Sequence, residues 1–180
     1  RGGGGRPPRG GPGRWGSEPR QPGQTWATGG AGLDAHFTAY RRVPAAPQAD
    51  TLRQMLALAQ EVDKPVVLHT RDAFPEIFAI LDEFPGVQGV FHCFSGNAAL
   101  AAEGLARGFY LSFAATVTYL GAHGIIGAAS IVPLDRMLVE TDAPFLPPQR
   151  RRGKPNAPRY LPAPVNRIAY LRGITPAAAP

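Results

Sequence analysis

Three apolar segments of the sequence end in side chains that can bind a metal ion or move a proton. His69 follows the run PVVL, His92 follows GVF, and Asp142 closes the segment MLVETD. Two imidazoles and a carboxylate suit a borderline divalent ion, and such an ion can activate water for hydrolysis. Each of the three alone is more often structural, as a hydrogen-bonded histidine or as a turn aspartate before proline. Their shared place at the ends of apolar runs favours a metal site.

Neighbouring residues receive weaker predictions. Glu140 lies two residues before Asp142, so on a strand it shares that face, and we expect it to support the metal site or orient a ligand rather than bind directly. Cys93 follows His92 and on a strand would face the helices, which favours a buried structural thiol over a thiolate ligand. His36 and His123 lie in weakly patterned stretches and receive no role.

A basic cluster follows the last of the three segments. The run RRRGK, from Arg150 to Lys154, is either a solvated, disordered loop or a clamp for phosphate oxygens. Arg71, two residues past His69, can contact phosphate in the same way. The formal net charge of +6 makes contact with phosphate plausible without establishing it.

The first 28 residues differ in composition from the rest of the chain. They are rich in Gly, Arg and Pro and contain almost no aliphatic side chains. Such a segment cannot bury enough apolar surface to offset its ordering entropy, so we predict that residues 1–28 are disordered. A linker, or upstream sequence translated in error, is favoured over a nucleic-acid-binding tail rich in Arg and Gly.

From residue 29 onward, short apolar runs alternate with apolar residues at helical spacing. The predicted strands are 29–34, 65–69, 87–92, 109–113 and 136–140. The predicted helices are 47–62, 72–84, 97–107, 120–131 and 164–171. This alternation predicts an α/β domain over residues 29–180, with a parallel sheet covered by helices. Polar residues at the carboxyl ends of successive strands favour a (β/α)₈ barrel over an open sheet.

Cysteine usage and hydropathy bear on the compartment. The single cysteine, Cys93, excludes an internal disulfide framework and suits a reducing compartment, so we expect a cytoplasmic protein. No apolar run reaches the ~18 residues of a membrane span, and no signal-peptide core lies near the start. Since the sequence does not begin with Met, we expect a fragment or a gene model with a misplaced start.

Together, these motifs resemble the TatD family of metal-dependent deoxyribonucleases. The resemblance rests on HTRDA, FHCFSG, GFYLSF, PLDRMLVETDAPFLPP and RRGKPNAPRY in that order, and GGAGLD resembles the family's GEIGLD. It covers about residues 29–160. It implies a (β/α)₈ barrel of the TIM type, a centre of two divalent ions (Mg²⁺, with Mn²⁺ or Zn²⁺ as alternatives) and hydrolysis of phosphodiesters in DNA, in single strands or from 3′ ends.

The same resemblance implies roles for individual residues. His69 and His92 match the ligands of one ion, while Asp142 matches a ligand of the other and the base that orients the attacking water. For the substrate phosphate we expect four residues, which are Arg71, Arg152, Lys154 and Asn156.

The sequence also departs from the family pattern. It contains no His-x-His pair, Gly30 replaces the glutamate that bridges the two ions, and Ala157 replaces a later glutamate. The chain therefore resembles roughly the last five of the eight barrel units. Two functions stay open: a nuclease that is active in its complete form, or a catalytically inactive, truncated barrel fragment that binds nucleic acid weakly.

Overall fold

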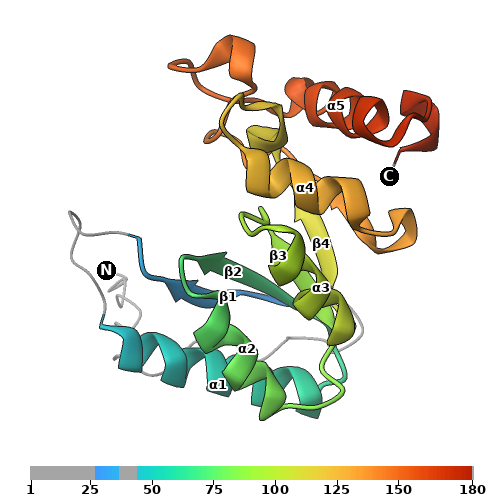
Figure 1. Ribbon diagram of the computed structural model, residues 1–180. Coiled ribbons are helices and arrows are strands. Elements are labelled where there is room, and N and C mark those ends of the chain that lie inside the picture. Colours follow the sequence, from blue (N-terminus) through green and yellow to red (C-terminus); the bar gives the residue numbers. More distant parts are fainter. Residues whose placement is uncertain (1–26, 37–43, 180) are drawn as a thin grey trace, which may run out of the picture.

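Five parallel strands form one sheet in the part of the chain that the computed structural model describes, residues 27–36 and 44–179 (Figure 1). The strands are β1 (Thr28–Asp34), β2 (Val66–Arg71), β3 (Gly89–His92), β4 (Tyr110–Phe113) and β5 (Met137–Val139). They lie side by side in chain order, and each neighbouring pair is parallel. The prediction of a parallel sheet is confirmed.

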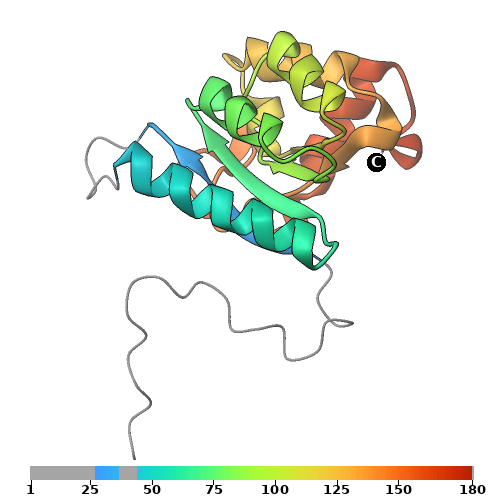
Figure 2. The ribbon, with the colours of Figure 1, turned by 90° about the horizontal axis from the view of Figure 1, so that it is seen from below.

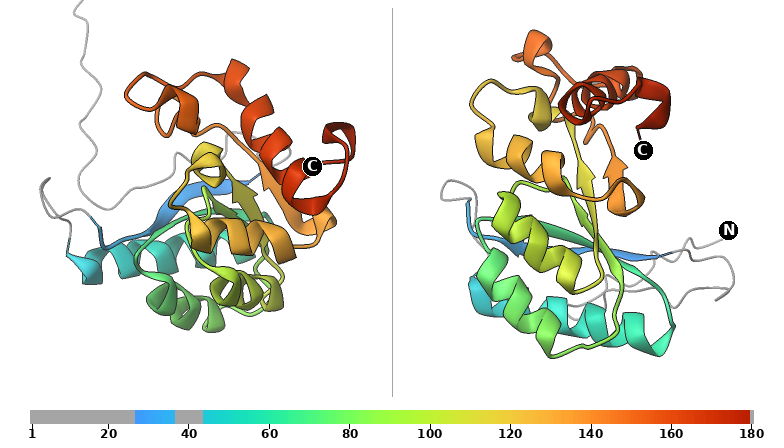
Figure 3. Two further views of the ribbon diagram at one scale, coloured as in Figure 1. Left: turned by 45° about the horizontal axis from the view of Figure 1, so that its top comes forward. Right: turned by 45° about the vertical axis from the view of Figure 1, so that its right-hand side comes forward.

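Helices connect the strands and cover one side of the sheet. They are α1 (Ala45–Glu61), α2 (Phe74–Asp82), α3 (Ala98–Ala106), α4 (His123–Ile131) and α5 (Pro162–Arg172). Consecutive helices contact one another from α1 through α5. Figures 2 and 3 show this succession along the sheet. Each strand is followed by a helix, and α1, α2 and α3 pack directly on strands, as in the repeating unit of parallel α/β folds.

Local sequence signals explain several of the helix boundaries. Asn97 caps α3, because its Oδ1 accepts a hydrogen bond from the backbone N–H of Leu100 at 3.0 Å. Gly108 follows α3 with a φ of 81°, in the left-handed region where glycine costs least. Pro75 lies in the first turn of α2, where a missing N–H is tolerated.

Aromatic side chains fill the layer between sheet and helices. Ring centroids in this layer lie 5.1–6.0 Å apart, a spacing typical of favourable aromatic pairs. The rings belong to Phe74, Phe78, Phe91, Phe94, Phe109 and Phe113. This cluster fixes strands β3 and β4 against α2 and thereby positions the carboxyl ends of the strands.

Strand alternation decides which side chains face away from the helices. In β2 the residues at 66, 68 and 70 are buried, while Val67, His69 and Arg71 are partly exposed. In β3 the same alternation leaves Val90 and His92 partly exposed. Since successive side chains point to opposite faces, His69, Arg71 and His92 share the face away from the helices.

The predicted boundaries need correction at several points. Thr28 was predicted to be disordered but belongs to β1. Residues 1–26 of the predicted disordered segment lie outside the described residues. His69 and Asp142 were both expected at the end of a strand. Strand β2 instead continues two residues past His69, and β5 ends three residues before Asp142. Helix α4 begins at His123 rather than at residue 120.

Short 3₁₀ segments were not predicted. They are η2 (Ala115–Thr118), η3 (Leu134–Arg136), η4 (Gln149–Arg151), η5 (Pro158–Tyr160) and η6 (Pro176–Ala178). Single 3₁₀ turns are too short to leave a periodic apolar pattern in the sequence. Within the described residues, none of the helices combines the length and the hydropathy of a membrane span.

Candidate active site at the carboxyl ends of the strands

The carboxyl ends of the strands bring five ionisable side chains to one region, which we call the mouth. It consists of Asp34, His69, His92, Glu140 and Asp142. His69 and His92 occupy paired positions of β2 and β3, and their ring centroids lie 5.8 Å apart. Asp142 is close enough to both imidazoles for their charges to affect its pKa. The structure thus brings together the three residues singled out in the sequence.

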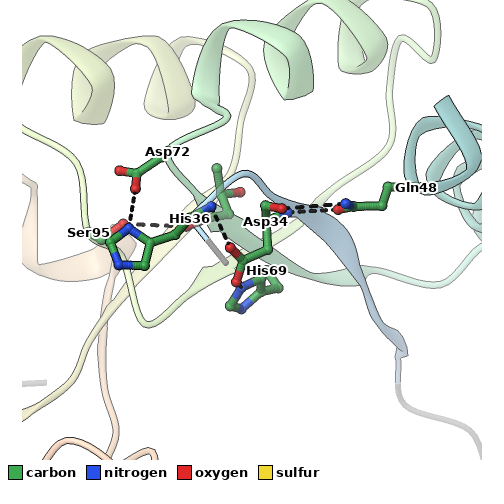
Figure 4. A network of polar contacts seen from close by, with 7 residues as sticks. Asp34, His36, Gln48, His69, Asp72 and Ser95 are labelled. Atoms are coloured by element: carbon green, nitrogen blue, oxygen red, sulfur yellow. Dashed lines mark hydrogen bonds and ion pairs between the residues drawn. The ribbon is translucent and has the colours of Figure 1, made fainter. Parts of the chain in front are cut away.

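His69 is held by a carboxylate that the sequence analysis did not single out. Its Nε2 lies 3.1 Å from Oδ2 of Asp34, the last residue of β1 (Figure 4). The other oxygen of Asp34 accepts the backbone N–H of His36 at 2.9 Å, and the Asp34 N–H donates to Gln48 at 2.9 Å. Burial opposes the charge of Asp34, but the hydrogen bonds from His36 and His69 outweigh it and lower the Asp34 pKa.

His92 is held in a similar way by Glu140. Its Nδ1 lies 3.2 Å from Oε2 of Glu140, while Oε1 of Glu140 accepts the backbone N–H of Cys93. This hydrogen bond raises the pKa of His92 above its ordinary 6.5, although burial opposes the shift. Burial likewise opposes the charge of Glu140, and the contact with His92 still lowers the Glu140 pKa. This contact agrees with the expectation that Glu140 orients a neighbouring group, and its support of a metal site stays a prediction.

Replacing Glu140 by glutamine should lower the pKa of His92. Protonated His92 is stabilised by the Glu140 carboxylate, so the pair stabilises the fold fully below pH 6.5, where both the folded and the unfolded imidazole are protonated. That contribution is lost as the pH rises through the higher folded pKa of His92. We expect Glu140→Gln to cost about 1 kcal/mol at pH 6 and less at pH 9.

The measurement is an NMR titration of the imidazole C–H signals, with urea denaturation at both pH values. Glu61→Gln serves as the control, because Glu61 is an exposed acid at the end of α1. An unchanged His92 titration in Glu140→Gln would contradict the pairing.

Asp142 differs electrostatically from the other two carboxylates. Burial raises its pKa, Glu140 adds to the rise, and His92 and His69 act against it. A carboxylate with a raised pKa is a better proton acceptor than an ordinary one. Its backbone has a φ of 53°, and Asp72 and Cys93 have similar values of 54° and 48° just after β2 and β3. Left-handed residues therefore follow three of the strands at the mouth, where strained backbone often marks functional sites.

The left-handed backbone of Cys93 bears on one prediction. Burial raises the pKa of its thiol to about 12, and the charges of Asp142 and Glu140 contribute. Cys93 lies just past β3 with a φ of 48°, so strand alternation does not decide the direction of its thiol, and its facing the helices stays a prediction. With such a pKa it stays protonated at neutral pH, as expected for a structural thiol.

His36, which received no role from the sequence, lies beside the mouth. Its Nδ1 is 2.7 Å from Oδ2 of Asp72, and its backbone N–H binds Asp34. Figure 4 shows both contacts next to His69. A polar network thus runs from β1 to the residue after β2. His123 begins α4 and does not belong to this network.

The donor types of the mouth suit a divalent metal ion, but their present pairing does not form a cage. Within residues 27–36 and 44–179, no three His, Cys, Asp or Glu side chains are grouped so that they could hold a metal ion. Each histidine gives one ring nitrogen to a carboxylate, which leaves one nitrogen per ring for a metal. Carboxylates in this position typically orient metal-binding histidines. The mouth is therefore a partial donor set, and a two-ion cluster stays a prediction.

The structure gives Asn156 a role other than phosphate binding. Its side chain is 6% exposed, and its Nδ2 donates to the carbonyls of Thr141, Phe145 and Leu146, the last two at 2.7 and 3.2 Å. Its Oδ1 accepts the N–H of Ala157. No amide donor remains for a phosphate, so Asn156 fastens the segment after Asp142.

Of the predicted phosphate-binding cations, Arg71 lies by the mouth, and Arg152 and Lys154 lie on the loop after Asp142. Burial is the largest influence on the pKa of Asp34 and of Cys93, and it raises both. The charge of Arg71 acts in the opposite direction on both groups, so its guanidinium lies near the mouth. The guanidinium of Arg152 stacks over the ring of Tyr119 at 4.8 Å, and Lys154 is exposed. The run from Arg150 to Lys154 includes η4, so it is not the disordered loop considered as one alternative. Phosphate contacts by these residues stay a prediction.

A comparison with known protein families identifies the fold and its lineage. A model of the TatD related DNase family matches residues 19–179. The chain belongs to the TatD family. That match covers the strands, the mouth and the basic run, and it confirms the resemblance drawn from the motifs.

Individual TatD relatives agree with this assignment. A metal-dependent hydrolase of Bacillus subtilis, YabD, is 40% identical over 151 residues, which cover 83% of this chain and 58% of that protein. A protein of Cronobacter sakazakii named 3′-5′ ssDNA/RNA exonuclease TatD is 37% identical over 163 residues, or 86% of this chain and 60% of the relative. The chain thus spans little more than half the length of these TatD proteins.

Solved structures give the same fold. The crystal structure of YjjV, a TatD homologue of Escherichia coli, matches with a TM-score of 0.79 at 29% identity, over 88% of this chain and 60% of that one. A TatD family hydrolase of Entamoeba histolytica matches with a TM-score of 0.68 at 19% identity, which shows the fold alone. The five parallel units are thus part of a TIM-type barrel of the TatD family.

Proposed function

We propose that the mouth is part of a metal-dependent phosphodiesterase centre that acts on DNA, in single strands or at 3′ ends. The observation that carries the proposal is the meeting of His69, His92 and Asp142 at one end of a parallel sheet, with each histidine oriented by its own carboxylate. The family, and the exonuclease name of one TatD relative, support the same reading.

Each mouth residue has a chemical task in this proposal. His69, His92 and Asp142 would hold a divalent ion, with Mg²⁺ preferred and Mn²⁺ or Zn²⁺ as alternatives. When bound, such an ion acidifies water and neutralises charge on phosphate oxygens. Glu140 and Asp34 fix the orientation and tautomer of the two imidazoles, because each accepts or shares one ring N–H.

Asp142 is the residue that would move the proton. As the water oxygen bonds to phosphorus, the bond from phosphorus to the leaving ester oxygen breaks. The water proton passes to the Asp142 carboxylate, and the leaving oxygen takes a proton from solvent. The raised pKa of Asp142 suits this task, since burial makes the carboxylate a stronger base. Arg71, Arg152 and Lys154 would contact phosphate oxygens. The single, unreactive cysteine fits a cytoplasmic location.

A second candidate is a catalytically inactive, weak nucleic-acid binder. Two observations favour it for the chain as given. No group of three potential metal ligands exists among the described residues. Gly30 lies where the family pattern has a bridging glutamate, and it brings no carboxylate to β1.

Digestion of a labelled single-stranded oligonucleotide separates the two functions. Nucleotide release that requires Mg²⁺ or Mn²⁺, stops with chelator and disappears in Asp142→Asn supports the hydrolytic centre. Binding of the oligonucleotide without any release supports the second candidate. Release that survives both chelator and Asp142→Asn would place hydrolysis outside the mouth.

A further inference from the structure

Residues 141–157 form a closed loop beside the mouth, which we call the rim loop. Its two ends are fastened by Asn156, whose backbone N–H donates to Pro144 at 2.9 Å and whose side chain holds the carbonyls of Phe145 and Leu146. The middle of the loop is fixed as well, because the Gln149 N–H donates to Thr118 and the Tyr119 hydroxyl donates to Pro147. The rim loop is therefore rigid in backbone despite its length.

One aromatic ring stands exposed on this rigid loop. Phe145 is 68% exposed. The other phenylalanines of the described residues are either buried in the core or, in the case of Phe84, packed against it. Its backbone N–H donates to the carbonyl of Asp142 at 2.9 Å, and its own carbonyl is held by Asn156. Because the backbone of Phe145 is already fixed, stacking of its ring on a ligand loses little conformational entropy. The ring thus lies three residues from the proposed base on a fixed support.

The chain after Asp142, which includes the rest of the rim loop, is strongly basic. No Asp or Glu occurs after Asp142, while the same stretch contains seven basic residues: Arg150, Arg151, Arg152, Lys154, Arg159, Arg167 and Arg172. In the described chain no ion pair involves any of them. Aromatic rings hold some of the guanidiniums in place, with Arg151 4.6 Å from the ring centroid of Tyr160 and Arg152 4.8 Å from that of Tyr119. Their charges are left for an anionic ligand.

An exposed aromatic ring on a loop that also carries cations without ion pairs matches one kind of polymer. Single-stranded nucleic acid offers base faces for stacking and phosphates for the cations, whereas a duplex hides its base faces. An acidic peptide would use the charges but has no regular need of a rigid aromatic ring. Charge complementarity and the ring together therefore favour a single strand.

We propose that Phe145 is the stacking platform for a base of single-stranded nucleic acid, with the basic residues of the rim loop on its phosphates. This proposal rests on the proposed function, since it takes nucleic acid as the polymer at the mouth. Phe145 is a positioning residue: it fixes the strand next to Asp142 and takes no part in bond breaking. If Phe145 stacks on a base, the affinity for a single strand depends on the bases as well as on the phosphate charges.

The test compares two oligomers of equal length and charge, oligodeoxythymidylate and an abasic oligomer, by fluorescence anisotropy in the presence of chelator. The full chain should bind the thymidylate oligomer about 5- to 100-fold more tightly, the range expected for one stacked base. Phe145→Ala should bring the ratio of the two affinities close to one, and Phe145→Leu should do nearly the same because it keeps bulk without a ring. Phe145→Tyr should retain the ratio.

Two further variants serve as controls. Tyr170 on α5 is 78% exposed and lies beside Arg167, so Tyr170→Ala removes an exposed aromatic ring elsewhere and should leave the ratio unchanged. Arg152→Gln should reduce the salt dependence of binding by roughly one unit while keeping the preference for bases.

Several outcomes would overturn the proposal: equal affinities of the two oligomers for the unmodified chain, no binding of either one, or a preference that survives Phe145→Ala. The first and the last of these leave the hydrolytic centre untouched, since that centre is tested separately by Asp142→Asn in the digestion assay. Conversely, a chain that stacks bases on Phe145 but releases no nucleotides would support this proposal and reject hydrolysis.

Discussion

Fusing a strand with a His-x-His pair ahead of residue 27, together with Gly30→Glu, should raise metal-dependent digestion of single-stranded DNA by at least about 100-fold, because each stabilising group of such a centre contributes about that much. The sequence has histidines only at 36, 69, 92 and 123, so no His-x-His pair is present. Without these ligands and the carboxylate at position 30, a bound water is less acidified and less well placed. We therefore expect little digestion by the chain as given.

The structure shows how Gly30→Glu can be accommodated. Gly30 lies at an irregularity in the pairing of β1 with β2, with a φ of 81° and no atom within 4 Å of an added Cβ. The substitution meets open space and costs about 1 kcal/mol of backbone strain. Adding Asp142→Asn to the fused protein is the control and should abolish the gained activity. Vigorous, chelator-sensitive digestion by the unmodified chain would contradict this account, since other residues would then replace the missing ligands.

Gly32→Ala should destabilise the fold by more than about 3 kcal/mol, because the clash is with backbone and cannot be relieved by a rotamer change. A Cβ at Gly32 would lie 1.8 Å from the carbonyl oxygen of His69. Strands β1 and β2 would have to separate where Gly32 pairs with His69, and the contact between Asp34 and His69 would be lost with them. Urea denaturation followed by circular dichroism measures the cost.

Gly30→Ala is the matched control for this prediction, since it lies two residues earlier in the same strand. Its added Cβ meets no neighbour, and only the positive φ opposes it, so the cost should stay near 1 kcal/mol. If Gly32→Ala were no more destabilising than Gly30→Ala, the close approach of β1 to β2 would be refuted.

Periodic apolar patterns predicted most of the fold. The runs before His69 and His92 and the helical spacing between them were enough to predict parallel strands with covering helices, and Asn97 and Gly108 marked the limits of α3 correctly. Burial of one face is the main determinant of such elements, and it leaves a direct trace in the sequence.

The pairing of side chains at the mouth left no such trace. Asp34 meets His69, and His36 meets Asp72, because of the register between β1 and β2, which includes the irregularity at Gly30. Cys93 has a left-handed backbone just past the end of β3, where strand alternation does not apply. An aspartate at the end of the weak strand 29–34 was the one available sign of the first pair, since the next two strands already carried the candidates His69 and His92.

Titration of the full chain with Mn²⁺, followed by the electron paramagnetic resonance of the free ion, tests the central claim that His69, His92 and Asp142 share a metal site. We expect at most one weak site per chain, because the mouth is a partial donor set in which each imidazole keeps one nitrogen for a metal. His69→Ala, His92→Ala and Asp142→Asn should each weaken binding at least about 10-fold. His123→Ala, which changes a histidine at the start of α4, should not. Unchanged Mn²⁺ affinity in all three mouth variants, or the absence of any binding by the unmodified chain, would contradict the claim.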